Sequence, residues 1–144
     1  MGHILRKVLD QMIEIYKPMD IDWMNYALTK NNKYTYHHIL EKKNGGKIDV
    51  DNGAILTIYS HRFLHFLEKM CPDAYNDLQS LFSRINASKA PMSSDDIDEV
   101  NSIVYRVLNG EYEMDKSVDL VKLRYSEYLK YYCDYDNIKK IHRK

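Results

Sequence analysis

The chain is poor in the residue types that mark several common protein classes. It has only two cysteines among 144 residues, Cys71 and Cys133, and they form no CxxC pair. Two isolated thiols are typical of reduced, buried side chains, so neither a disulfide framework nor a cysteine-bound zinc is expected. No apolar run approaches the ~20 residues of a membrane-spanning helix, and the N-terminus lacks the apolar core of a signal peptide. We therefore expect a cytoplasmic protein without a membrane partner.

The chain also lacks net charge, with 21 basic and 21 acidic side chains. Proteins that bind nucleic acids usually carry a basic footprint, so neutrality counts mildly against that class. The distribution softens this objection, because residues 30–69 hold seven basic and four acidic side chains, a local excess of three positive charges. The remainder of the chain is correspondingly negative.

Length and hydrophobic periodicity predict one domain, residues 1–144, of an α+β, mostly helical fold. We expect a small β-hairpin core surrounded by four to five helices. Asn86–Ser94 is the best candidate for a linker, and Asn109-Gly110 is a helix stop. The expected helices cover 4–16 or 4–17, 61–70 with Ser60 as N-cap, 73–85 with Asp73 as N-cap, 94–108 and 117–132; the expected strands cover 34–40 and 54–58.

Four of the six histidines lie in one stretch, which reads YHHILEKKNGGKIDVDNGAILTIYSHRFLH. His37 and His38 are adjacent on the first expected strand, where neighbouring side chains point to opposite faces, so they cannot perform the same role. His61 and His65 are four apart in an expected helix and share one of its faces. One strand histidine and two helix histidines are a plausible ligand set for a metal ion, with the other strand histidine left free beside it.

This ordered set resembles the HNH nucleases, the ββα-metal family, and within them the branch with an all-histidine metal site found in bacterial nuclease toxins. The matching features are a His-His pair ending a strand, the Gly45-Gly46 pair in the following loop, Asn52 before a second short strand, and His-x-x-x-His on a helix. The match covers residues 34–70 at most, and each feature alone is weak evidence. The cysteine pairs of the zinc-stapled HNH branch are absent.

The resemblance implies a role for each of these residues. His37, His61 and His65 would hold one divalent metal ion (zinc, nickel, cobalt, manganese or magnesium), and nitrogen ligands favour the transition metals over magnesium. His38 would be the general base, a role that suits an imidazole near neutral pH, and a loop carbonyl would orient it. Asn52 would tie the loop and help to hold the base. Phosphate contacts are expected from Arg62, Lys42, Lys43 and Lys47, although simple solvation is the favoured explanation for these four side chains.

The C-terminal part of the chain carries many of its 13 tyrosines. Apolar and tyrosine side chains recur there with spacings of three and four, which is typical of one helix face. Packing onto the protein's own core is the favoured interpretation, and the alternatives are a homodimer seam or an aromatic surface that contacts a partner or a nucleic acid. The stripe comprises Val118, Val121, Tyr125, Tyr128, Tyr132 and Tyr135.

The leading hypothesis is a metal-dependent HNH endonuclease or nickase that hydrolyses DNA with little sequence readout. The alternative is an HNH-derived module that binds a protein or DNA without cleaving it, for instance a regulatory factor of a phage or mobile element. A purely structural zinc site is a weaker idea, because such sites are normally closed by four protein ligands.

Overall fold

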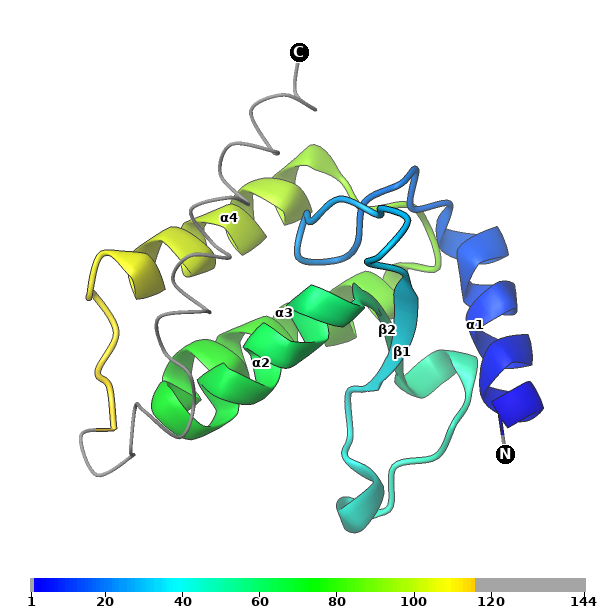
Figure 1. Cartoon of the computed structure of the whole chain (residues 1–144), viewed down its shortest axis with the longest axis horizontal. Helices are drawn as coiled ribbons and strands as arrows, with labels where there is room; N and C mark the ends of the chain where they lie inside the picture. Colours follow the sequence, from blue (N-terminus) through cyan, green and yellow to red (C-terminus); the bar gives the residue numbers. More distant parts are fainter. Residues whose placement is uncertain (1, 116–144) are drawn as a thin grey trace.

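The computed structural model describes residues 2–115 of the chain (Figure 1). The expected helix 117–132, its tyrosine stripe and Cys133 lie outside these residues. The described elements are the helices α1 (Gly2–Tyr16), α2 (Ile58–Met70), α3 (Pro72–Ser88) and α4 (Ser94–Leu108), the strands β1 (Tyr34–His38) and β2 (Gly53–Thr57), and two short 3₁₀ turns, η1 (Lys42–Asn44) and η2 (Val50–Asn52).

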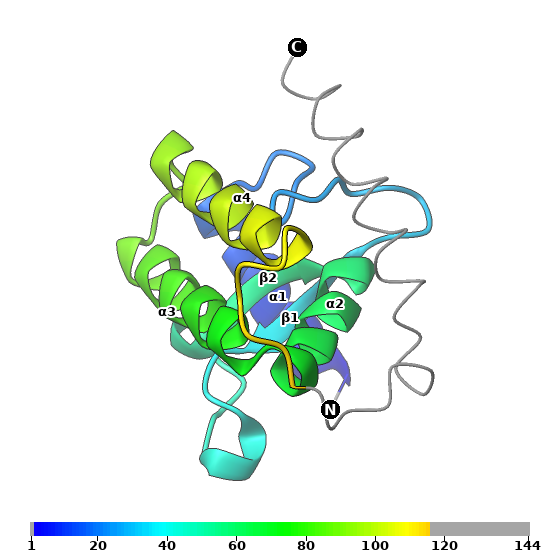
Figure 2. The same cartoon turned by 90° about the vertical axis from the view of Figure 1, so that its left-hand side faces the viewer.

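The two strands form an antiparallel hairpin between two layers of helix. Tyr34 pairs with Thr57 and His38 with Gly53, which fixes the register along the whole hairpin. In Figure 1, α1 covers one side of the hairpin while α2 and α3 cover the other, and both groups contact the strands. Figure 2 shows α4 beside α3, which it packs against. The expected α+β class with a β-hairpin is confirmed.

The helices are amphipathic and meet around one hydrophobic cluster. All five residues of β2 are buried, because helices cover both faces of the hairpin. Trp23, from the irregular segment between α1 and β1, is 1% exposed and meets Tyr16 edge to face, with ring centroids 4.9 Å apart. Such pairs add to the stabilisation that burial of apolar area provides. Cys71, at the junction of α2 and α3, is buried here as expected.

Helix α2 begins earlier than the sequence predicts. Its N-cap is Thr57, whose hydroxyl accepts a hydrogen bond from the Ser60 backbone N–H, so Ser60 as N-cap is wrong. The fully buried carboxylate of Asp22 accepts hydrogen bonds from both the N–H and the hydroxyl of Thr57. The tertiary contact from Asp22 thereby fixes the start of α2. The sequence alone does not reveal this start, because residues 55–59 are mostly β-branched or aromatic and favour a strand.

Further boundaries differ from expectation: α1 begins at Gly2 rather than residue 4, and β2 spans Gly53–Thr57 rather than 54–58. β1 ends at His38 rather than residue 40, because β2 begins at Gly53, opposite His38. Pro72 occupies the first turn of α3, so Asp73 is not its N-cap. The expected linker shrinks to residues 89–93, since α3 runs to Ser88 and Ser93 already caps α4 in a reciprocal capping box with Asp96. Proline in a first helical turn and a Ser-x-x-Asp box are both favourable helix starts.

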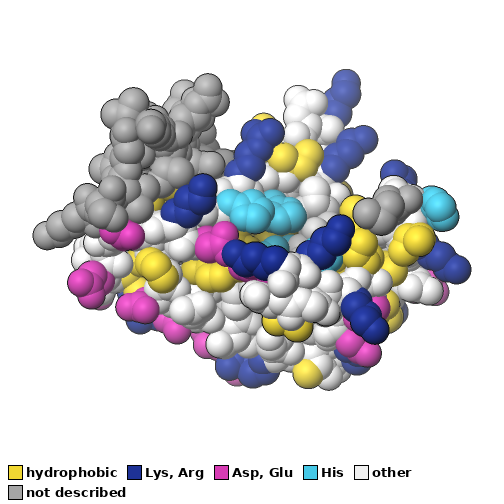
Figure 3. Space-filling model, turned by 90° about the horizontal axis from the view of Figure 1, so that it is seen from below, with side chains coloured by type: hydrophobic (Ala, Val, Ile, Leu, Met, Phe, Trp, Pro, Cys, Tyr) yellow, Lys and Arg dark blue, Asp and Glu magenta, His cyan; other side chains and the backbone are white. Residues whose placement is uncertain are grey.

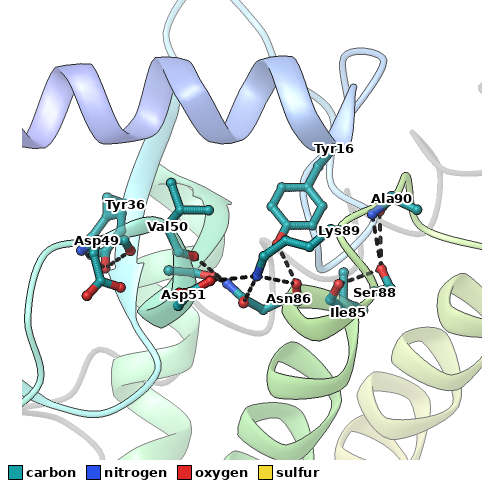
Figure 4. Close-up of polar contacts among 11 residues, drawn as sticks. Tyr16, Tyr36, Asp49, Val50, Asp51, Ile85, Asn86, Ser88, Lys89 and Ala90 are labelled. Carbon is teal, nitrogen blue, oxygen red and sulfur yellow. Dashed lines mark hydrogen bonds and ion pairs between the residues drawn. The ribbon is translucent and has the colours of Figure 1, made fainter.

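A polar cluster joins α1, α3 and the entry to β2 (Figure 4). The Tyr16 hydroxyl donates to the Asn86 carbonyl at 2.6 Å, and the Asn86 amide donates to the carbonyls of Val50 and Gly53 at 2.7 and 2.8 Å. The Lys89 ammonium reaches the Asn86 carbonyl and the Asp51 carboxylate, each at 2.9 Å. The start of β2 is therefore fixed from both sides.

Among residues 2–115, no helix has the length and apolar character that crossing a membrane requires.

Candidate functional site

The four histidines of the hairpin and α2 meet in one pocket. The pocket has a volume of about 350 Å³ and is also lined by Glu41, Lys42, Lys43, Glu68 and Tyr75. Figure 3 shows histidine side chains gathered on one face of the molecule, with lysine or arginine side chains on several sides and acidic side chains beside them. Residues far apart in the sequence thus converge, as the sequence pattern predicts.

His37 is held by a residue that the sequence analysis did not identify. Its ring is 4% exposed, and its Nε2 lies 2.7 Å from Oε1 of Gln79, on α3. Burial lowers the pKa of His37 to about 4, with smaller contributions from the neighbouring histidines. The imidazole is therefore neutral at pH 7, which is the form that binds metals.

His61 and His65 lie on one face of α2, as the four-residue spacing predicts. Their rings stack with centroids 5.0 Å apart, and the His61 ring lies 5.3 Å from that of His37. Thr35 on β1 contacts Nδ1 of His61 at 3.0 Å. Burial lowers the pKa of His61 to about 4 as well. His65 is more exposed and lies 3.9 Å from a carboxylate oxygen of Glu68, one turn further along α2.

The three expected metal ligands are compatible with one ion in donor chemistry, and the two ring separations known among them match such a site. Two imidazoles that bind one zinc through nitrogens at ~2.1 Å place their ring centroids about 5 Å apart, close to both separations observed. In residues 2–115 no three histidine, cysteine or acidic side chains are already arranged around a common point. The rings of His61 and His65 are nearly parallel, at 16°, and binding requires the exposed His65 ring to turn toward the other two.

His38 lies beside these rings but has a different environment. It follows Tyr36 on the same strand face, and the two rings meet edge to face at 5.0 Å. Its Nε2 is buried and has no hydrogen-bond partner within the described residues. The loop carbonyl expected to orient its other ring nitrogen is not found among them either, because the chain leaves the strand immediately after His38. Both strand histidines nevertheless line the same pocket.

Asn52 ties the loop between the strands, as the resemblance implies. Its side-chain oxygen accepts from the Leu40 N–H at 2.7 Å, and its amide donates to the carbonyls of Leu40 and Lys47, both at 3.0 Å. Gly46 fits against this contact so closely that a Cβ there would lie 1.7 Å from the Leu40 oxygen. Gly45 has a φ of +91°, in the left-handed region that glycine adopts without steric cost.

The expected phosphate contacts divide into two groups. Lys42 and Lys43 line the pocket, whereas Arg62 and Lys47 are exposed and do not. The Lys43 ammonium pairs with the Glu41 carboxylate at 3.0 Å. Phosphate contacts from Arg62 or Lys47 therefore require a ligand that extends beyond the pocket.

Two carboxyl groups in the pocket were not expected from the sequence. Glu41 and Glu68 share a hydrogen bond, which lowers the pKa of Glu41 to about 2, assisted by Lys43, and raises the pKa of Glu68. Tyr75 donates to Glu41 at 3.2 Å. The sequence held a signal for Glu68, which completes a His-x-x-x-His-x-x-Glu face on α2, but none for Gln79 on the next helix.

No protein-family model, no curated protein and no solved structure matches this chain. The residues and their geometry alone carry the functional argument.

Proposed function

We propose that this protein is a metal-dependent endonuclease of the HNH type, which hydrolyses phosphodiester bonds of DNA. The observation that carries the proposal is the pocket in which β1 and α2 bring His37, His38, His61 and His65 together beside a loop tied by Asn52. Each of these positions belongs to the ordered pattern that resembles the HNH family.

His37, His61 and His65 would hold one divalent ion, which neutralises a non-bridging phosphate oxygen and stabilises the departing 3′ oxygen. His38, which lines the pocket, accepts the proton of the attacking water. Lys42 and Lys43 lie at the pocket where the phosphate backbone enters, and they position DNA without reading its sequence. Asn52 maintains the loop that carries both lysines.

The test is conversion of supercoiled plasmid by the purified protein with Mg²⁺, Mn²⁺, Ni²⁺ or Zn²⁺. We expect metal-dependent nicking that EDTA abolishes and that His38→Ala reduces at least 100-fold, the lower end of a general base's contribution of about 10²–10⁴. His3→Ala is the matched control, because it removes an exposed histidine of α1 outside the pocket. A His38→Ala variant that nicks as fast as wild type refutes the assignment of the base.

One observation favours a second candidate, a binding module that retains the metal site without cleaving DNA. The pocket contains two carboxyl groups, Glu41 and Glu68, and negative charge there opposes the entry of phosphate. Metal binding that is lost in His61→Ala, together with intact plasmid under every metal tested, would establish this alternative. Nicking that depends on His38 excludes it.

A further inference from the structure

We infer that Gln79 and Thr35 are positioning residues that fix which nitrogen of His37 and which nitrogen of His61 is free to bind the metal. The inference rests on the proposed metal site and extends it to α3, outside the hairpin and α2. It assigns metal binding to Nδ1 of His37 and to Nε2 of His61.

The assignment for His37 follows from the orientation of the Gln79 amide. The amide nitrogen of Gln79 lies 2.7 Å from the carbonyl oxygen of Ile39, which can only accept a hydrogen bond. The amide nitrogen therefore faces Ile39, and Oε1 faces His37 as an acceptor. Nε2 of His37 must then carry the proton, which leaves the lone pair of the neutral ring on Nδ1. No described residue hydrogen-bonds to that atom.

The assignment for His61 follows in the same way from Thr35. The Thr35 hydroxyl has one proton, and at 2.8 Å it donates that proton to the carbonyl oxygen of Leu56. Toward His61 the hydroxyl can only accept, so Nδ1 of His61 carries the proton at the 3.0 Å contact. The lone pair of the neutral His61 ring is then on Nε2, which no described residue contacts by a hydrogen bond.

Gln79 also connects His37 to the rim of the pocket. Its amide nitrogen donates to the Tyr75 hydroxyl at 3.1 Å, and that hydroxyl donates to the Glu41 carboxylate at 3.2 Å. In this series of hydrogen bonds each group donates to the next, from the His37 ring to the Glu41 carboxylate. A chain that ends on an anion polarises each preceding bond, so His37 becomes a better electron donor at Nδ1.

The test measures tautomers in the metal-free protein and Co²⁺ affinity separately. Nitrogen-15 correlation spectra of the histidine rings at neutral pH are expected to show a protonated Nε2 in His37 and a protonated Nδ1 in His61. Gln79→Leu should lose the His37 preference and weaken Co²⁺ binding about 10–100-fold. Gln79→Glu keeps an acceptor for His37 but loses the donor to Ile39 and Tyr75, so it should restore the His37 preference. Thr35→Val should release only the His61 preference.

Two controls make the same chemical changes at exposed positions, Gln11→Leu on α1 and Thr29→Val before β1. Both should behave as wild type, and circular dichroism confirms that each variant is folded. A His37 ring protonated at Nδ1, or a folded Gln79→Leu variant with wild-type Co²⁺ affinity, overturns the inference while wild-type metal binding still stands. A wild-type protein that binds no divalent metal overturns the proposed function, whatever its tautomers, and the metal assignment with it.

Discussion

Replacement of Asp22 by asparagine is expected to destabilise the fold strongly, although the two side chains have nearly the same shape. The Asp22 carboxylate is fully buried, and donors contact both of its oxygens. One oxygen accepts from the N–H groups of Met24 and Tyr26 at 2.8 and 2.9 Å, and the other from the N–H and hydroxyl of Thr57, both at 2.8 Å. Asparagine can match only one of these two sides.

The magnitude follows from what the amide leaves unpaired. With its oxygen toward Met24 and Tyr26, the amide nitrogen faces the Thr57 N–H, and a buried donor without an acceptor costs about 1–3 kcal/mol. The retained bonds also lose their charge, which weakens each of them by roughly half. Burial raises the pKa of Asp22, so the charge as a whole costs free energy on folding, and its removal offsets this weakening. The unpaired donor then sets the net fall at about 1–3 kcal/mol, a large part of the ~5–15 kcal/mol typical of a folded domain.

Urea denaturation followed by circular dichroism measures this change. With a slope of about 2 kcal/mol per molar urea, the midpoint should fall by about 0.5–1.5 M. Asp20→Asn is the matched control, because Asp20 is exposed in the same segment and its replacement should stay within about 0.5 kcal/mol of wild type. If the two variants have equal midpoints, Asp22 does not anchor the start of α2 and the reasoning is wrong.

Three further results are expected. The pKa of His37 is about 4, below the ordinary value of 6.5, so the unfolded chain binds more protons between these pH values. The contribution of His37 to the free energy of unfolding of the metal-free protein should therefore fall by up to about 3 kcal/mol from pH 6.5 to pH 4, and urea titrations should show a smaller total fall for His37→Gln than for wild type. Gly46→Ala should lower the melting temperature more than Gly45→Ala, because its Cβ meets the Leu40 backbone whereas that of Gly45 meets nothing within 4 Å; equal melting temperatures would contradict the tight fit. Asn52→Ala removes three hydrogen bonds that tie the loop and should slow plasmid nicking more than tenfold, and an unchanged rate would show that the tie does not serve the site.

The convergence of the histidines was predictable because it depends on local periodicity. The two strand histidines meet the two helix histidines once the chain reverses its direction between the strands. The polar loop with its glycine pair allows that reversal. Asn52 was identified only through its place in the family-like pattern. The pairing of His37 with His61 and His65, rather than with His38, follows from the alternation of strand faces.

The rest of the site depends on tertiary contacts that leave no periodic signal. Gln79 is one polar residue on an amphipathic helix, and its contact with His37 exists only because α3 packs beside the hairpin. The start of α2 depends in the same way on Asp22, 35 residues before its partner Thr57. Glu41 meets Glu68 across the pocket because the hydrogen bonds of Asn52 hold the loop close to the strands. The sequence of a polar loop does not predict that path.

Because Gln79 on α3 contacts His37, the smallest segment that could carry this site to another protein extends beyond α2. The pattern that resembles a known family ends near Met70, and a fragment cut there would contain every residue of that pattern. Such a fragment would expose the buried side of α2, leave Nε2 of His37 without its acceptor, and lose the Asn86 amide that secures the entry to β2. A graft of this site onto another scaffold must therefore include α3 up to Ser88, or replace it with a helix that presents an amide at the same place.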